Sequence, residues 1–306
     1  TISSSSLLRY PSGDAAFYIQ LNKIEKYGRV NKLEALLQAN RSVCFANFHL
    51  KLVKRRNTMV QTKAKGISSF SLHILAMALM LGDHLWATLF PAQEWLTCIG
   101  RIAFPIFAFM IVEGFFHTSN VRRYISRIFI FAIVSEIPFN LIYGSSLIYP
   151  FHQNVLWTFL IALLCITFLG KIKEGKKWWV TWPVIVITAL AGYLLGTITM
   201  VDYYGAGVLT VLTFYIFHER KWWCFLGQFM CLAVLNIWVI GGYFYPVTLA
   251  GYEFQIVQQG FALLSLIPIW LYHGRQGYHS KWFQYVCYAF YPAHLLLLYW
   301  IWQWAI

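Results

Sequence analysis

Long apolar windows follow one another along most of this chain and limit what it can fold into. A membrane-spanning helix needs about 20 consecutive apolar residues. Windows of about that length, some of them shorter, lie near residues 70–90, 98–116, 125–143, 154–170, 178–200, 203–217, 222–240, 256–272 and 282–304. The chain is 11% charged, whereas soluble domains have about 25% charged residues. The sequence predicts an all-α, polytopic integral membrane protein with about nine transmembrane helices.

The basic residues between these windows predict how the helices are oriented. If nine helices alternate in direction, the loops rich in Lys and Arg all fall on one side of the membrane. The basic residues of these loops are Lys63 and Lys65, Arg122 and Arg123, Lys171 to Lys177, Arg220 and Lys221, and Arg275 and Lys281. By the positive-inside rule this side is cytoplasmic, and so is the N-terminus. The net charge of +13 is then a topology signal, and we expect membrane lipids but no nucleic acid as partners.

The first 58 residues differ in composition from the rest of the chain. They are mixed and basic, and they end in LVKRRNT just before Met59. They lack the continuous apolar stretch of a secretory signal. We expect residues 1–58 to be a basic N-terminal extension, either disordered or not native, with Met59 as the natural start. Residues 59–306 are expected to form the transmembrane domain.

Polar side chains inside the apolar windows are the strongest functional signal. An ionisable group within a membrane span is costly and is retained mainly where it has a function. At 1.5 Å per residue, the alternating helices bring one set of polar residues to a common outer layer: Asp83, His84, Arg101, Glu136, Asn140, Gln153, Asn154, Asp202 and Gln258. We predict a site in this layer. The alternative is that these groups are hydrogen-bonded contacts between helices.

Arg101 is the one basic residue after Met59 that falls on the outer side. Two interpretations stay open: its side chain extends to the outer lipid headgroups, or it faces the bundle and pairs with Asp83 or Glu136. Neighbouring residues of a helix do not face each other. We therefore expect Asp83 to pair with Arg101 or another helix rather than with His84.

A second polar cluster is predicted at the cytoplasmic side, formed by Glu113, His117, Arg122, Arg123 and Arg127, with His273 and Arg275 after the window 256–272. The planar guanidinium group suits phosphate, so these residues are candidates for binding a polyphosphate cofactor from the cytosol. Paired arginines are also ordinary topology signals, and this alternative stays open. The six cysteines are scattered without a CxxC pair, so we predict no metal site.

Five stretches of the sequence resemble the TraX family, membrane proteins named for N-acetylation of conjugal-transfer pilin. They are LMLGDHLWATLFP, GRIAFPIFAFMIVEGFFHTSNVRRYISRIFIFAIVSEIPFNL, DYYGAGVL, LYHGRQG and YAFYPAHLLLL. The resemblance covers about residues 66–304. TraX proteins are more distantly similar to membrane acyltransferases with a histidine in the outer part of their first helix, and His84 matches that place.

The resemblance implies acetyl transfer from cytosolic acetyl-CoA to an acceptor, which would be a protein such as a pilin N-terminus or a surface glycan or lipid. It also implies a bacterial cytoplasmic membrane. The catalytic candidates are then His84, as general base, with Asp83, Arg101 and Glu136. Arg101 and the amides of Asn140 and Asn154 are candidate oxyanion donors. We expect the acceptor at Asn140, Gln153, Asn154, Asp202 and Gln258, and acetyl-CoA at Glu113, Arg122, Arg123 and Arg127.

Two other classes of function stay open. A secondary transporter would use the polar residues of the first three windows as a path between the two faces. Such folds usually contain internal repeats and broken helices; Pro105, Pro138 and Pro292 interrupt three windows, but we find no convincing repeat. A non-catalytic assembly factor of a secretion or conjugation system would need no strongly polar outer layer. The sequence therefore favours the acetyltransferase.

Overall fold

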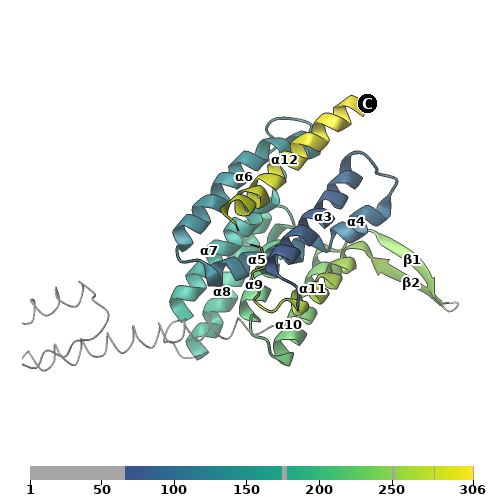
Figure 1. The fold of residues 1–306 in the computed structure, drawn as a ribbon. Helices are drawn as coiled ribbons and strands as arrows, with labels where there is room; N and C mark the ends of the chain where they lie inside the picture. The colour runs from purple at the N-terminus through teal and green to yellow at the C-terminus, as the bar shows by residue number, and fades with distance from the viewer. Residues whose placement is uncertain (1–65, 174–177, 250–251, 279, 306) are drawn as a thin grey trace, which may run out of the picture. The chain divides into compact units, whose positions relative to one another are not determined.

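The computed structural model describes residues 66–173, 178–249, 252–278 and 280–305, which are mostly helical (Figure 1). The prediction of a basic extension over residues 1–58 lies outside the described residues, and the proposed boundary at residue 59 therefore stays a prediction. The helices come in chain order as α3 (Ser69–Thr88), α4 (Glu94–Gly100), α5 (Ala103–His117), α6 (Val121–Tyr143), α7 (Val155–Lys173), α8 (Trp178–Ile198), α9 (Tyr204–Ile216), α10 (Trp222–Ala233), η1 (Val234–Ile240), η2 (Gln258–Ser265), α11 (Leu266–Leu271) and α12 (Lys281–Ala305).

Six helical segments of the described residues are long and apolar enough to cross a membrane: Ser69–Thr88, Glu94–His117, Val121–Tyr143, Val155–Ile172, Trp179–Ile198 and Trp222–Ile240. Two further apolar segments, Tyr204–Ile216 and Gln258–Leu271, are shorter. The mostly helical fold is therefore confirmed, and the six segments are compatible with an integral membrane protein. The count of nine spans and the cytoplasmic N-terminus stay predictions.

The outer surface of the helices has the character of a lipid-facing surface. Exposed aliphatic side chains line α6 and α8, among them Ile130, Ile133, Val134, Ile137, Val186, Ile187 and Leu190. Exposed tryptophans lie near the first turns of α8, α10 and α12: Trp179, Trp182, Trp222, Trp223 and Trp282. Tryptophan is enriched at membrane interfaces, so these positions indicate where the helices enter the bilayer.

The loops meet at two opposite ends of the helix bundle. At one end, which we call the polar end, Gln153 and Val201 form a β-bridge and Gln258 Nε2 lies 3.4 Å from Thr97 Oγ1. At the other, the basic end, Ile67 and Tyr272 form a β-bridge. The predicted outer layer falls at the polar end, and the predicted arginine cluster falls at the basic end.

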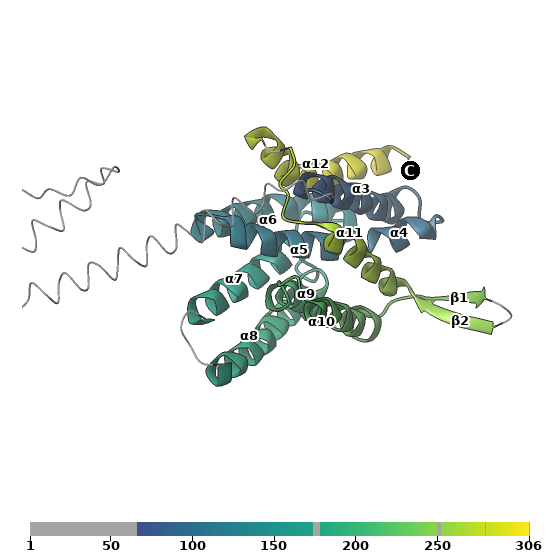
Figure 2. The same cartoon turned by 60° about the horizontal axis from the view of Figure 1, so that its bottom comes forward.

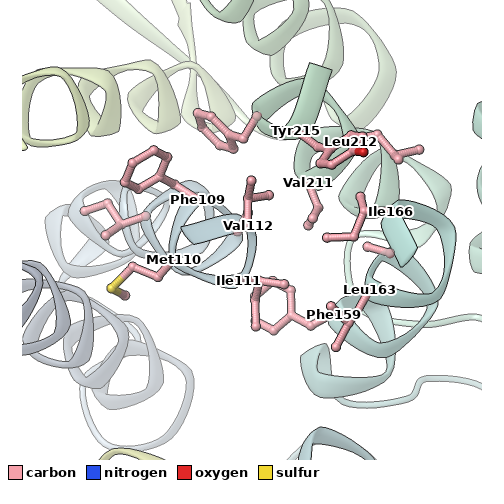
Figure 3. Close-up of a cluster of buried hydrophobic side chains, with 14 of the residues drawn as sticks. Phe109, Met110, Ile111, Val112, Phe159, Leu163, Ile166, Val211, Leu212 and Tyr215 are labelled. Atoms are coloured by element: carbon pink, nitrogen blue, oxygen red, sulfur yellow. The ribbon is translucent and has the colours of Figure 1, made fainter. Parts of the chain in front are cut away.

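Helix α5 is the centre of the bundle because it is apolar on all sides. From Ala103 to Val112 every residue except Phe107 is buried, and the helix contacts α3, α7, α9, η2 and α11. Figure 3 shows the core that α5 forms with α7 and α9, made by Phe109, Met110, Ile111, Val112, Phe159, Leu163, Ile166, Val211, Leu212 and Tyr215. This apolar core fills the bundle between its two ends.

Helix α12 closes the bundle against elements far away in the sequence. It packs on α6 and α3, and its position beside α6 is visible in Figure 1. A second, smaller apolar cluster joins it to α6 through Phe139, Ile142, Tyr291, Leu295 and Leu298. The last helix therefore lies next to the first described one.

A β-hairpin interrupts the helices and was not predicted. Strands β1 (Phe244–Leu249) and β2 (Tyr252–Val257) pair antiparallel, from Phe244 opposite Val257 to Leu249 opposite Tyr252. The hairpin projects away from the helices (Figure 2). Hydropathy alone assigned the start of the window 256–272 to a helix, although the aromatic and β-branched residues of YEFQIV favour a strand.

Candidate functional site

A cavity of about 180 Å³ lies at the polar end of the bundle. Four of the predicted site residues line it, namely Asp83, His84, Arg101 and Asp202. Aromatic residues make up much of the remaining wall, including Phe104, Phe139, Tyr143, Phe159, Tyr203 and Tyr291. A mostly apolar cavity with a few convergent polar groups is the usual form of a small-molecule site.

Arg101 and Asp83 form the predicted ion pair across α3 and the α4–α5 segment. Arg101 Nη2 donates to Asp83 Oδ1 at 2.7 Å and to Thr97 Oγ1 at 2.7 Å. The Thr97 hydroxyl donates to Asp83 Oδ1 at 2.7 Å. The side chains of Arg101 and Asp83 are only 20% and 18% exposed. Arg101 therefore faces the bundle, and the interpretation that it extends to the headgroups is wrong.

Two further residues hold this pair in place. A Cβ atom at Gly100 would lie 2.4 Å from Asp83 Cβ, so only glycine allows α4 to approach α3 this closely. Gln258 Nε2 lies 3.4 Å from Thr97 Oγ1. The predicted site residue Gln258 thus contacts the pair through Thr97 and is not among the residues that line the cavity.

His84 is buried in the cavity wall and contacts a second histidine. His84 Nδ1 lies 2.6 Å from His294 Nε2, and the two rings stack at a centroid distance of 4.9 Å. No role was predicted for His294 from the sequence. The signal was present, because His294 is also an ionisable residue inside an apolar window.

The turn between α8 and α9 supplies Asp202 and Tyr203 to the cavity in a strained conformation. Met200, Tyr203 and Tyr204 have positive φ angles of 52°, 61° and 48°, which L-residues other than glycine rarely adopt. Gln153 N donates to Met200 O and Asp202 N donates to Gln153 O, both at 2.9 Å. Such strain persists only where the surroundings impose it, often at functional sites. The backbone of Gln153 therefore bonds to this turn at two positions and helps to hold it in place.

His152 is a further cavity residue that was not predicted from the sequence. Its Nε2 lies 3.5 Å from Asp202 Oδ1. Burial lowers the pKa of His152, but the hydrogen bond and charge of Asp202, together with the charge of Glu136, outweigh burial and raise the pKa above its ordinary value. The signal in the sequence was its position directly before Gln153 and Asn154.

Glu136, Asn140 and Asn154 lie beside the cavity and are not among its lining residues. Asn154 Nδ2 donates to Glu136 Oε2 and to Ala132 O, and Trp157 Nε1 donates to Glu136 Oε2 at 2.8 Å. Asn140 Nδ2 donates to Leu147 O at 3.3 Å. These bonds join α6 to α7 and to the following loop. The hydrogen bonds of these three residues are typical of contacts between membrane helices. Their roles in a reaction stay predictions.

The residues of the predicted cytoplasmic cluster have different partners. Among the described residues, the ion pairs of Glu113 are with His218, at 2.7 Å, and with His117, at 3.8 Å. Arg127 lies over the rings of Tyr124 and Tyr288, while Arg122 and Arg123 are exposed in the first turn of α6. Three arginines thus share one helix end, and Glu113 faces His218.

We predict that Arg101→Gln and Asp83→Asn each lower the stability of the detergent-purified protein by about 1.5–3 kcal/mol, because each leaves a charged hydrogen-bonding partner unpaired. The double variant should lose less than the sum, with a coupling of about 0.5–3 kcal/mol. Thermal unfolding measures this. Arg101→Gln combined with Glu136→Gln is the matched control and should be additive; additivity with Asp83→Asn would contradict the pair.

We predict that the contribution of His152 to stability depends on pH. A raised folded-state pKa means that the pair with Asp202 stabilises the protein fully below the unfolded-state pKa of about 6.5, and that this stabilisation is lost as the pH rises through the folded-state pKa. His152→Gln should therefore lower the melting temperature more at low pH than at high pH. The loss should be below about 1 kcal/mol because the pair is partly exposed. Asp202→Asn should abolish the difference, and a pH-independent effect would contradict the prediction.

Comparison of the sequence with known proteins identifies relatives of this chain. The model described as "TraX protein" matches residues 68–302. The probable fimbrial assembly protein FimC, serogroup H1, of Dichelobacter nodosus is 26% identical over 249 residues, which are 76% of this chain and 94% of that protein. Protein TraX of Escherichia coli is 29% identical over 149 residues, 48% of this chain and 55% of that protein. No solved structure matches this chain. Since the family match extends from before Asp83 to beyond His294, the chain, with the whole of its cavity, belongs to the TraX protein family.

Proposed function

We propose that this protein is a membrane-bound acetyltransferase, which moves an acetyl group from cytosolic acetyl-CoA to an amine or hydroxyl acceptor. The observation that carries the proposal is that His84 and Arg101 line one cavity. Acyl transfer needs a base and a cationic or hydrogen-bonding group for the developing oxyanion, and these two side chains supply both.

The chemistry assigns one role to each side chain. His84 takes the proton of the acceptor as its nitrogen or oxygen attacks the thioester carbonyl carbon. The guanidinium of Arg101 stabilises the negative charge on the carbonyl oxygen. The carbon–sulfur bond then breaks, and the sulfur leaves with the proton that His84 had taken. Asp83 keeps Arg101 in place through their 2.7 Å contact.

The acceptor is proposed to enter at the polar end. Of the five predicted acceptor-binding residues, Asp202 lies in the cavity wall. An acceptor in the cavity would therefore contact Asp202. Gln153, Asn154, Asn140 and Gln258 hold the surrounding turns and helices. The Dichelobacter relative is named as a fimbrial assembly protein, which favours a protein acceptor such as a pilin N-terminus over a surface glycan or lipid.

The donor is proposed to bind at the basic end. This assignment uses the predicted topology of nine spans with a cytoplasmic N-terminus in a bacterial cytoplasmic membrane. The exposed guanidinium groups of Arg122 and Arg123 suit phosphate; Glu113 does not, because it is an anion already paired with His218. At 1.5 Å per residue, Arg122 and the cavity residue Phe139 are about 25 Å apart along α6. A bound donor would have to extend over this distance, and the helices around the apolar core would have to part to admit it.

A non-catalytic assembly factor is the second candidate, because of the name of the Dichelobacter relative. The alternative function of a transporter is not supported by the name of a relative. The apolar core of Figure 3 lies between the cavity and the basic end, and on α6 the buried residues Ile128 and Ala132 separate Arg122 from Glu136. A continuous polar path along α6 is therefore interrupted.

We predict that His84→Gln lowers the rate of acetyl transfer by about 10²–10⁴-fold, the usual contribution of a general base. The assay follows transfer of labelled acetyl from acetyl-CoA to candidate acceptors by membranes that contain the protein. The matched control is His73→Gln, a histidine of the same helix that bonds the carbonyl of Ser69 and should keep full activity. Wild-type turnover by His84→Gln would remove His84 from the mechanism, and absence of any transfer by the wild type would favour the assembly factor.

We predict that Arg122→Gln with Arg123→Gln weakens CoA binding by the purified protein, and that the loss shrinks at high salt because exposed charges are screened. Thermal stabilisation by CoA measures binding, since a ligand of the folded state raises its stability. Lys171→Gln, another exposed cation at the basic end, is the matched control. An unchanged CoA affinity in the double variant would show that these arginines act in membrane insertion alone.

A further inference from the structure

His84 and His294 form a buried chain of hydrogen bonds that ends on a backbone carbonyl. His84 Nδ1 lies 2.6 Å from His294 Nε2, and His294 Nδ1 lies 2.6 Å from Phe290 O. The two side chains are only 7% and 6% exposed. Because α3 and α12 are far apart in the sequence, the contact depends on the closure of the bundle.

The chemistry of these contacts limits where the protons can be. A carbonyl oxygen only accepts, so His294 Nδ1 must carry a hydrogen and donate it to Phe290 O. Two ring nitrogens 2.6 Å apart need one proton between them. Either neutral His294 accepts at Nε2 from the Nδ1–H of His84, or cationic His294 donates to an unprotonated His84 Nδ1.

The surroundings favour the neutral arrangement. The His294 ring stacks on Phe290 at a centroid distance of 4.6 Å and lies 5.9 Å from Tyr291. The nearby Asp83 carboxylate is bonded to Arg101 and Thr97. A charge buried without a partner is costly, and the Arg101 cation in the same cavity adds repulsion. Both rings are therefore neutral.

We propose that His294 is a positioning residue that holds His84 as its Nδ1–H tautomer. His84 Nε2, the other ring nitrogen of a side chain that lines the cavity, is then left with a free lone pair. This is the state that a general base needs. The consequence for catalysis rests on the proposed function, whereas the tautomer itself does not.

The same chain of bonds orients the ring during the reaction. When His84 Nε2 takes a proton, its Nδ1–H continues to donate to His294, whose Nδ1–H continues to donate to Phe290 O. No bond in the chain has to break. His294 thus fixes both the direction and the tautomer of His84 without contacting the reacting atoms.

The direct test is nitrogen NMR of the detergent-purified protein labelled with ¹⁵N-histidine, with His84→Gln used to assign the His84 signals. In the wild type we expect His84 to be protonated at Nδ1 and unprotonated at Nε2. A proton on Nε2 of neutral wild-type His84 would overturn the proposal. This measurement uses no acceptor and no acetyl donor, so it does not depend on the proposed function.

A matched pair of variants separates the hydrogen bond from packing. Gln at residue 294 offers an amide oxygen as acceptor, and Met has a similar shape with only a weak one. His294→Gln should keep the His84 tautomer, and His294→Met should shift it toward Nε2–H. An unchanged tautomer in His294→Met would overturn the proposal.

Activity gives a second readout. In serine proteases, a wrong histidine tautomer lowers kcat by about 10⁴-fold. Because His294 is a neutral acceptor, we expect a smaller loss in His294→Met, about 10–100-fold in kcat with KM unchanged. His294→Gln should restore the activity. Equal loss in both variants, with the tautomer intact, would show that His294 only packs. If the tautomer is as expected but the wild type transfers no acetyl, the proposed function fails and the assignment of the tautomer stands.

Discussion

The ion pair between Arg101 and Asp83 is the constraint on which the polar end of the molecule depends. Charged groups inside a membrane protein need partners because the surroundings cannot solvate them. Here the partners come from two helical segments, and Thr97 bonds to both charges. Gly100 permits the approach. The pair therefore ties α3 to the α4–α5 segment and at the same time places the guanidinium in the cavity wall.

The turn between α8 and α9 forms another part of the cavity wall, beside Arg101, and is held by different interactions. The turn from Met200 to Tyr204 holds three non-glycine residues with positive φ, a conformation that costs about 1–3 kcal/mol for each residue. Backbone bonds to Gln153 and the bond from Thr158 Oγ1 to Asp202 O impose it. The ion pair and the strained turn thus both keep the polar groups of the cavity in place.

Much of this arrangement could be predicted from local rules. Hydropathy located the helical windows, and the cost of a buried charge favoured a carboxylate partner for Arg101, either Asp83 or Glu136. Contacts between distant helices could not be predicted in this way. Nothing local indicates that α12 packs on α3, so the partner of His84 was missed. Glu136 was predicted to lie in the same layer as Asp83, but only its position relative to α7 shows that Asn154 and Trp157 bind its carboxylate. The hairpin was missed because hydropathy does not distinguish a strand from a short helix.

The apolar core between the two ends determines how a reaction in the cavity could exchange protons and water. Its side chains, among them Val112, Leu163 and Val211, are fully buried, so the core separates His84 from the basic end unless the helices part to admit a donor. A proton taken up by His84 in the proposed reaction would have to go to the leaving sulfur or exit by the polar end, where the partly exposed His152 and Asp202 lie. The same core would shield a reactive thioester from water. The separation of the two ends therefore suits group transfer better than hydrolysis.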